Sequence, residues 1–165
     1  MWNGKKVLAG IFLALILALP LGAFGETPAV PRSPSAEGAE VGFANIEDGD
    51  VLPPVFTVRF SISGMGIAPA GVAIDNTGHH HLLIDIEELP DMNGPLPATD
   101  RIRHFGKGQN ETTLELPEGT HTLQLLLADH AHLPHDPPVM SDVITITVDA
   151  DAPPQAATGE EGAGP

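Results

Sequence analysis

Hydrophobic and polar residues alternate along several short segments in the middle of this chain. Residues 55–63 (VFTVRFSIS) place Phe56, Val58 and Phe60 on one face and polar side chains on the other. Successive side chains of a strand point to opposite faces, so this period of two predicts a β-strand. The same alternation predicts further strands at 80–86, 112–116, 122–129 and 143–148, and shorter ones at 41–46 and 102–105. No segment keeps the 3.6-residue period of an amphipathic helix.

Turns rich in glycine and proline separate these segments, which is typical of an all-β domain. Leucines and isoleucines line one predicted face of each later strand, such as Leu82, Ile84 and Ile86, or Leu123 and Leu125. We therefore expect a single immunoglobulin-like antiparallel β-sandwich of about seven strands over residues 40–149. A region of this length can bury one hydrophobic core without help.

The two ends of the chain have a different composition. Lys5 and Lys6 precede an apolar run, and Ala23 and Gly25 fit the small-residue positions of a cleavage site before Glu26. Residues 1–25 are therefore predicted to be a signal peptide, which leaves a periplasmic or secreted protein with no stable membrane anchor after cleavage. Residues 26–39 are expected to be a disordered linker and residues 150–165 a disordered acidic tail, because neither has enough apolar residues to bury.

The chain is strongly acidic, with a formal net charge of −15. The predicted signal peptide contains two lysines and no acid, so its removal changes this charge to −17. Such a surface repels nucleic acid and anionic lipid and attracts cations, so we expect no nucleic-acid partner. The chain has no cysteine, which excludes disulfides and thiolate ligands. We expect a monomer.

Three of the eight histidines are consecutive in the sequence. On a strand His79 and His81 share one face, about 6–7 Å apart, so their imidazoles can converge on one metal ion. Asp85 lies further along that face. His80 falls in line with Leu82, so we expect it to cap the core and to form a hydrogen bond with a backbone group.

A second group follows a predicted strand in a proline-stiffened loop and contains His130, His132 and His135. Proline restricts the backbone, so such a loop loses less entropy when it presents ligands. His104 lies in a separate segment. The candidate metal ligands are thus His79, His81, His104, His130, His132 and His135, and the expected ion is copper or zinc. A solvated or structural role for each remains the alternative.

Three other features of the sequence have both a binding and a structural interpretation. Met65 lies in a glycine-rich loop, where it can serve a copper ion or fill a gap in the core. Arg101, Arg103 and Lys107 form the one basic stretch and predict a small anion site, or a hairpin whose cations offset the acidic surface. His121 is expected to be a structural histidine with its hydrogen bonds satisfied.

Several runs in a fixed order carry a family resemblance. They are Gly64-Met65-Gly66 with Pro69-Ala70-Gly71, Gly78-His79-His80-His81-Leu82-Leu83-Ile84-Asp85, His104-Phe105-Gly106-Lys107-Gly108-Gln109, Gly119-Thr120-His121-Thr122-Leu123-Gln124-Leu125, and the loop 130–138. Together they resemble the bacterial exported family known as domain of unknown function 4399, over nearly all of residues 41–148. The resemblance implies an exported β-rich domain and carries no established activity.

Four functions are compatible with these patterns. The leading hypothesis is an exported module that binds copper or zinc for buffering or transfer. The alternative is a non-catalytic interaction module that binds an envelope protein or a glycan and has structural histidines. A domain that responds to pH through its clustered imidazoles is a third. A hydrolase with a histidine-held metal is the fourth. The sequence has no Gly-x-Ser-x-Gly motif, no Walker loop, no His-Glu-x-x-His motif and no dinucleotide-binding fingerprint.

Overall fold

The computed structural model describes residues 31–155, and this part of the chain contains strands and no helix. No helix that could cross a membrane is therefore found within 31–155. The predicted signal peptide and most of the predicted tail lie outside the described residues. The strands are β1 (Glu40–Phe43), β2 (Val51–Leu52), β3 (Val55–Ser63), β4 (Gly66–Ile67), β5 (Thr77–Ile84), β6 (Ile102–His104), β7 (Glu111–Glu115), β8 (Gly119–Ala128) and β9 (Ile144–Val148).

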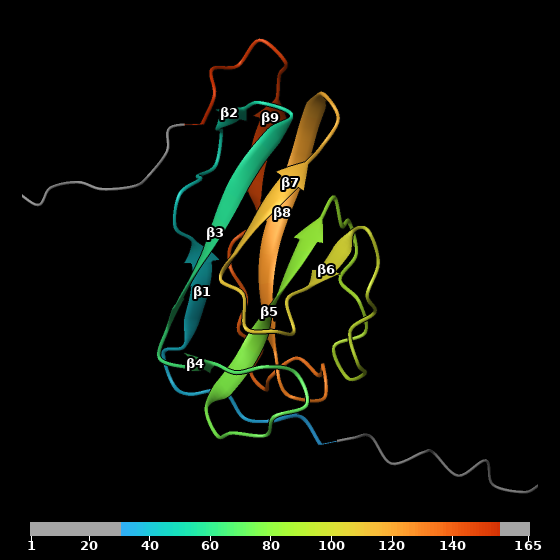
Figure 1. Cartoon of the computed structure of the whole chain (residues 1–165). Helices are drawn as coiled ribbons and strands as arrows, with labels where there is room; N and C mark the ends of the chain where they lie inside the picture. Colours follow the sequence, from blue (N-terminus) through green and yellow to red (C-terminus); the bar gives the residue numbers. More distant parts are fainter. Residues whose placement is uncertain (1–30, 156–165) are drawn as a thin grey trace, which may run out of the picture.

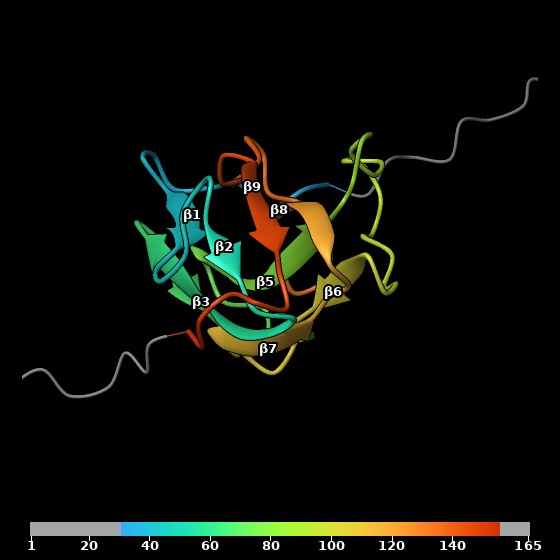
Figure 2. The same ribbon diagram turned by 90° about the horizontal axis from the view of Figure 1, so that it is seen from above.

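The strands form two sheets that enclose the core (Figures 1 and 2). One sheet has the order β1-β3-β7, and the other has the order β2-β9-β8-β5-β4, with β6 paired to β5. Phe56 and Val58 of the first sheet pack with Leu123, Leu125 and Ile146 of the second. This sandwich-like arrangement confirms the predicted all-β class, and the immunoglobulin-like topology stays a prediction.

Strand β5 is buried on both faces, which is unusual for a strand of an antiparallel sheet. Its inner face carries His80, Leu82 and Ile84 toward the main core. Its outer face carries His79 and His81. The same outer face carries Leu83, which forms a smaller apolar cluster with Leu126 and Ala128 of β8 and with the loop residue Leu96. The sheet therefore has a second buried region outside the main core.

The predicted strands and the inward positions of β3, β8 and β9 are confirmed, with three differences. Strand β5 ends at Ile84 because Asp85 adopts a left-handed φ of 52°, so Ile86 joins the outer cluster and not the core. The loop around Met65 contains the short strand β4. Finally, β4 pairs with β5, and β2 with β9, in parallel orientation.

Residues outside the predicted 40–149 range also pack on the domain. The Ser33 hydroxyl donates to Asp129 Oδ2 at 2.7 Å, and the Arg32 Nε donates to the Pro134 carbonyl at 2.9 Å. At the other end, the side chain of Gln155 bonds to the backbone of Thr57. Arg32, Ser33 and Gln155 thus contact the domain from outside the predicted range.

Candidate metal site

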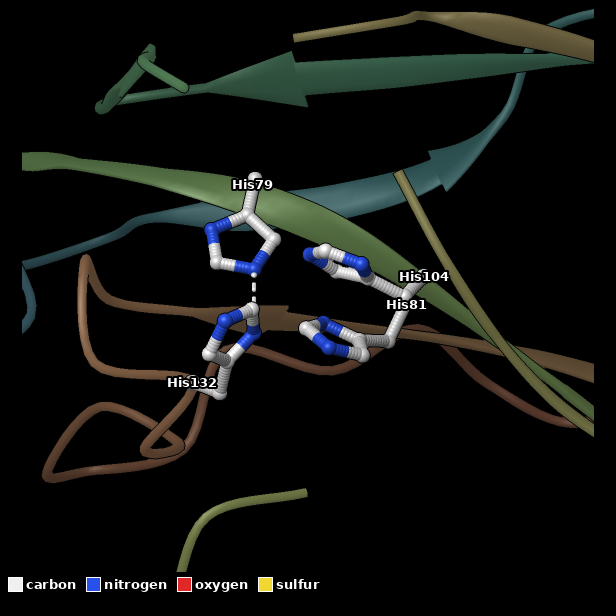
Figure 3. A group of neighbouring side chains, drawn as sticks. All are labelled: His79, His81, His104 and His132. Atoms are coloured by element: carbon white, nitrogen blue, oxygen red, sulfur yellow. Dashed lines mark hydrogen bonds between the residues drawn. The ribbon is translucent and has the colours of Figure 1, made fainter. Parts of the chain in front are cut away.

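Four histidines from three separate segments converge on the outer face of β5 (Figure 3). One ring nitrogen from each of His79, His81, His104 and His132 lies within 4.8 Å of the other three. His79 Nε2 and His132 Nδ1 share a hydrogen bond of 3.2 Å. The ring centroids of His104 and His132 are 4.5 Å apart. We call these four residues the histidine cluster.

Strand pairing places three members of the histidine cluster. His79 and His81 are two residues apart on β5, so both point to the outer face. His104 on β6 lies directly opposite His81 in the antiparallel register, and opposite residues share a face. The period of two and the β5–β6 register thus bring the three rings together without help from a loop.

The fourth member comes from a tight turn after β8 that Asp129 holds together. The Asp129 Oδ1 accepts hydrogen bonds from the backbone N–H groups of Ala131 at 2.8 Å and Leu133 at 3.1 Å. The His132 N–H donates to the Asp129 carbonyl at 3.0 Å. His132 itself has a φ of 66°, a left-handed conformation that non-glycine residues adopt rarely. The turn therefore fixes His132 in a strained conformation that turns its ring toward His79.

Burial and mutual repulsion lower the pKa of three members of the cluster, His79, His81 and His104. Burial, together with the neighbouring His104 and His132, lowers the pKa of His79 to about 4. Burial and the three neighbouring imidazoles lower the pKa of His81 to about 3. Burial and His132 also lower the pKa of His104. Neutral imidazoles each offer a lone pair, which is the form that binds a metal ion.

The cluster is costly for the metal-free fold. Nδ1 of His79 and Nδ1 of His81 are buried and have no hydrogen-bond partner among the described residues. A buried polar group left without a partner costs about 1–3 kcal/mol. Strained backbone, unsatisfied buried nitrogens and several lowered pKa values in one place are characteristic of functional sites.

The spacing fits a single ion with small movements. Four nitrogens bonded at about 2.0–2.1 Å to one tetrahedral ion lie about 3.3–3.4 Å from one another. The 3.2 Å separation between His79 and His132 already matches this value, and the widest separation of 4.8 Å must shrink by about 1.5 Å. His104 and His132 lie closer to the surface than the buried pair and have room to move.

Two of the six predicted ligands lie outside the histidine cluster. His130 is exposed on the loop. His135 is buried, and its ring nitrogens face the carbonyl oxygens of Thr77 at 3.2 Å and Leu127 at 3.5 Å. The structure therefore brings together His79, His81, His104 and His132, and it places His135 in a structural position.

Two other histidines were expected to be structural. His121 is satisfied as expected, because Nδ1 bonds to Asp85 at 2.8 Å and Nε2 to the Pro117 carbonyl at 2.9 Å. The predicted backbone hydrogen bond of His80 is wrong. Both of its ring nitrogens are buried without a partner among the described residues, because its ring faces the apolar core against Phe60, with centroids 5.0 Å apart. Asp85 does not join the histidine cluster, because it bonds to His121.

The remaining candidates are placed elsewhere. Met65 is buried in the main core, with 9% of its surface exposed, so its thioether is a packing group. The Arg101 Nε donates to the Ile84 carbonyl and the Arg103 Nε to the Asp100 carbonyl. Lys107 is exposed. The guanidinium groups of Arg101 and Arg103 thus each bond to a backbone carbonyl.

The sequence reasoning missed Asp129 as a residue of the site. An aspartate that begins a turn and accepts hydrogen bonds from the following N–H groups is a recognised pattern. In the sequence Asp129 directly precedes His130-Ala131-His132, and this position could have indicated that Asp129 supports the turn.

Comparison with known proteins supports a family assignment. The model of the family described as Domain of unknown function (DUF4399) matches residues 58–149, which is more than half of the chain. This range contains the whole histidine cluster. No curated protein and no solved structure gives a significant match.

Proposed function

The chain belongs to the family described as Domain of unknown function (DUF4399), and from its site we propose that it binds one divalent transition-metal ion. His79, His81, His104 and His132 are the ligands. The ion is copper(II) or zinc. Binding serves buffering or transfer of the metal in the periplasm or outside the cell.

The observation that supports this proposal is the convergence of four imidazoles from β5, β6 and the loop after β8. Apolar residues would fill the same space at lower cost, because two buried nitrogens of the cluster have no partner among the described residues. A bound ion offsets that cost, since binding to the folded state alone stabilises it.

The ligand type argues for a borderline divalent ion. Imidazole nitrogen suits zinc and copper(II), whereas copper(I) prefers the sulfur of cysteine or methionine. The chain has no cysteine, and Met65 lies in the core. Within this group the intrinsic affinity order places copper(II) above zinc. Four protein ligands fill a tetrahedral shell, which favours storage or transfer over hydrolysis, since catalytic zinc keeps one position open for water.

A metal titration of the untagged protein tests this proposal, because a histidine tag would itself bind metal. Copper(II) and zinc are titrated calorimetrically into the wild-type chain and the variants His104→Asn and His132→Asn. These two members lie closer to the surface, so their replacement leaves the buried pair in place. We expect one ion per chain, and a loss of affinity of at least about 100-fold in each variant, since even loss of an outer-shell partner costs 10–100-fold.

His130→Asn is the matched control, because His130 lies in the same loop and outside the histidine cluster. It removes one imidazole and is expected to bind metal like the wild type. If the wild-type chain binds neither ion more tightly than micromolar, or if His130→Asn weakens binding as much as His132→Asn, the proposal is wrong.

A further inference from the structure

We infer that Gly106 is a positioning residue for the metal site, because its missing side chain is the space that the His104 ring occupies. The inference rests on the proposed function. Gly106 follows β6 by two residues and contributes no ligand atom of its own. It acts on the site through His104 alone.

The geometry around Gly106 carries this inference. A Cβ atom built on Gly106 would lie 2.3 Å from His104 Cε1 and 2.3 Å from His104 Nε2. Both distances are far inside van der Waals contact, so any side chain at this position collides with the ring. The next neighbour is the Cβ of Ala70 at 3.1 Å, which needs to move by only a few tenths of an ångström.

The ring must yield in this collision, because the backbone on both sides is held. The Phe105 N–H donates to the His80 carbonyl at 3.0 Å, and the Gly106 carbonyl accepts from the Ala70 N–H at 2.9 Å. The φ of Gly106 lies outside the left-handed region, so alanine fits this backbone conformation. The His104 ring, by contrast, can adopt another rotamer about its two side-chain bonds and lies close to the surface.

Gly106→Ala is therefore expected to swing the His104 ring away from its partners. Its centroid now lies 4.9 Å from that of His79, 5.1 Å from that of His81 and 4.5 Å from that of His132. A site left with three imidazoles binds metal more weakly. We expect the affinity to fall about 10–100-fold, the range found when a partner that orients a ligand is removed.

The test compares wild type, Gly106→Ala and Gly94→Ala by copper(II) titration and by chemical unfolding of the metal-free proteins. Gly94 is the control, because it is a loop glycine outside the left-handed region whose added Cβ would meet only Asp91 Oδ2 at 3.3 Å. The expected result is weaker copper binding for Gly106→Ala with unfolding midpoints close to wild type. Electron paramagnetic resonance of the copper-loaded proteins is expected to show four coupled imidazole nitrogens in the wild type and three in Gly106→Ala.

A double-variant cycle separates this role from a general structural one. If Gly106 acts through His104, Gly106→Ala adds no further loss of affinity in a His104→Asn background. Equal losses in both backgrounds, or unchanged affinity in Gly106→Ala, would overturn the inference while the proposed function stands. If the wild type itself does not bind, the proposed function fails. In that case nuclear magnetic resonance of the metal-free proteins tests the claim that a side chain at position 106 displaces the His104 ring. Unchanged His104 ring resonances in Gly106→Ala would overturn that claim.

Discussion

The Asp129 carboxylate is expected to be the main support of the turn that carries His132, and its removal to affect both folding and metal binding. Only 2% of its surface is exposed. It accepts hydrogen bonds from Ser33 Oγ and from the N–H groups of Ala131 and Leu133. Burial raises the pKa of Asp129, but these hydrogen bonds lower it by a larger amount. The group is therefore a stable anion in the folded protein.

The magnitude follows from the groups that Asp129→Ala leaves without a partner. Two backbone N–H groups lose their acceptor, the buried one of Leu133 and the part-buried one of Ala131. A buried donor left without a partner costs about 1–3 kcal/mol, and a part-buried one costs less. Ser33 is half-buried and can turn to water, so its loss adds little. We expect a loss of about 3 kcal/mol in the free energy of unfolding. Asp129→Asn keeps the Oδ1 acceptor of both N–H groups and is expected to lose less than about 1.5 kcal/mol.

Urea unfolding of the metal-free proteins measures both values, and metal titration follows in parallel. Because His132 holds a left-handed φ only while the turn is closed, Asp129→Ala is also expected to weaken metal binding by about 10–100-fold. Because the pKa of Asp129 is lowered in the folded protein, its contribution to stability depends on pH. This contribution is present above about pH 4 and is lost as the pH falls through the folded-state pKa. Equal destabilisation by Asn and Ala, or unchanged metal affinity in Asp129→Ala, would refute this reasoning.

Three further outcomes are expected. His80→Leu should raise the free energy of unfolding by about 1–3 kcal/mol, because it removes two buried nitrogens that have no partner among the described residues. Burial lowers the pKa of His80 to about 4, so the unfolded chain binds the proton first and the gain in urea unfolding should be larger at pH 5 than at pH 8. His121→Gln should lose stability, by less than about 1 kcal/mol since Asp85 is partly exposed, and lose more at pH 5.5 than at pH 8. Burial lowers the pKa of His121, but its hydrogen bonds to Asp85 and Pro117 and the charge of Asp85 raise it above its ordinary value. The contribution of His121 to stability is therefore complete below about pH 6.5 and disappears as the pH rises through the pKa of the folded state. Copper(II) or zinc at 100 times its Kd should stabilise the wild type by about 2.7 kcal/mol in thermal unfolding, and an unchanged Tm would count against a site in the folded state.

The sequence predicted the strands well because their inner faces follow a simple alternation. Residues 55–63 and the leucines of β8 lie where the period of two placed them. The burial of both faces of β5 was not predictable in this way, because it depends on loop residues such as Leu96 that pack against the outer face of the sheet. The end of β5 was missed because Asp85 leaves the strand to bond to His121, a partner 36 residues away.

Half of the histidine cluster followed from local reasoning. His79 and His81 share a face of any strand, but the choice among His104, His130, His132 and His135 depends on long-range register and on a turn. A histidine in an exposed loop and one in a buried loop look alike in the sequence. Gly106 was missed because its role is to leave space for the His104 ring, and Asp129 because its role is to accept hydrogen bonds in a turn. Neither role is visible in the composition or in the period of the sequence.

X-ray absorption of the untagged protein loaded with one equivalent of zinc or copper(II) tests the central claim most directly, since it counts the ligands around the ion. The expected first shell is four nitrogen scatterers at about 2.0–2.1 Å with the outer-shell pattern of imidazole, reduced to three in His132→Asn and unchanged in His130→Asn. A first shell made of oxygen, or one that His132→Asn does not alter, would contradict the claim that the histidine cluster holds the metal.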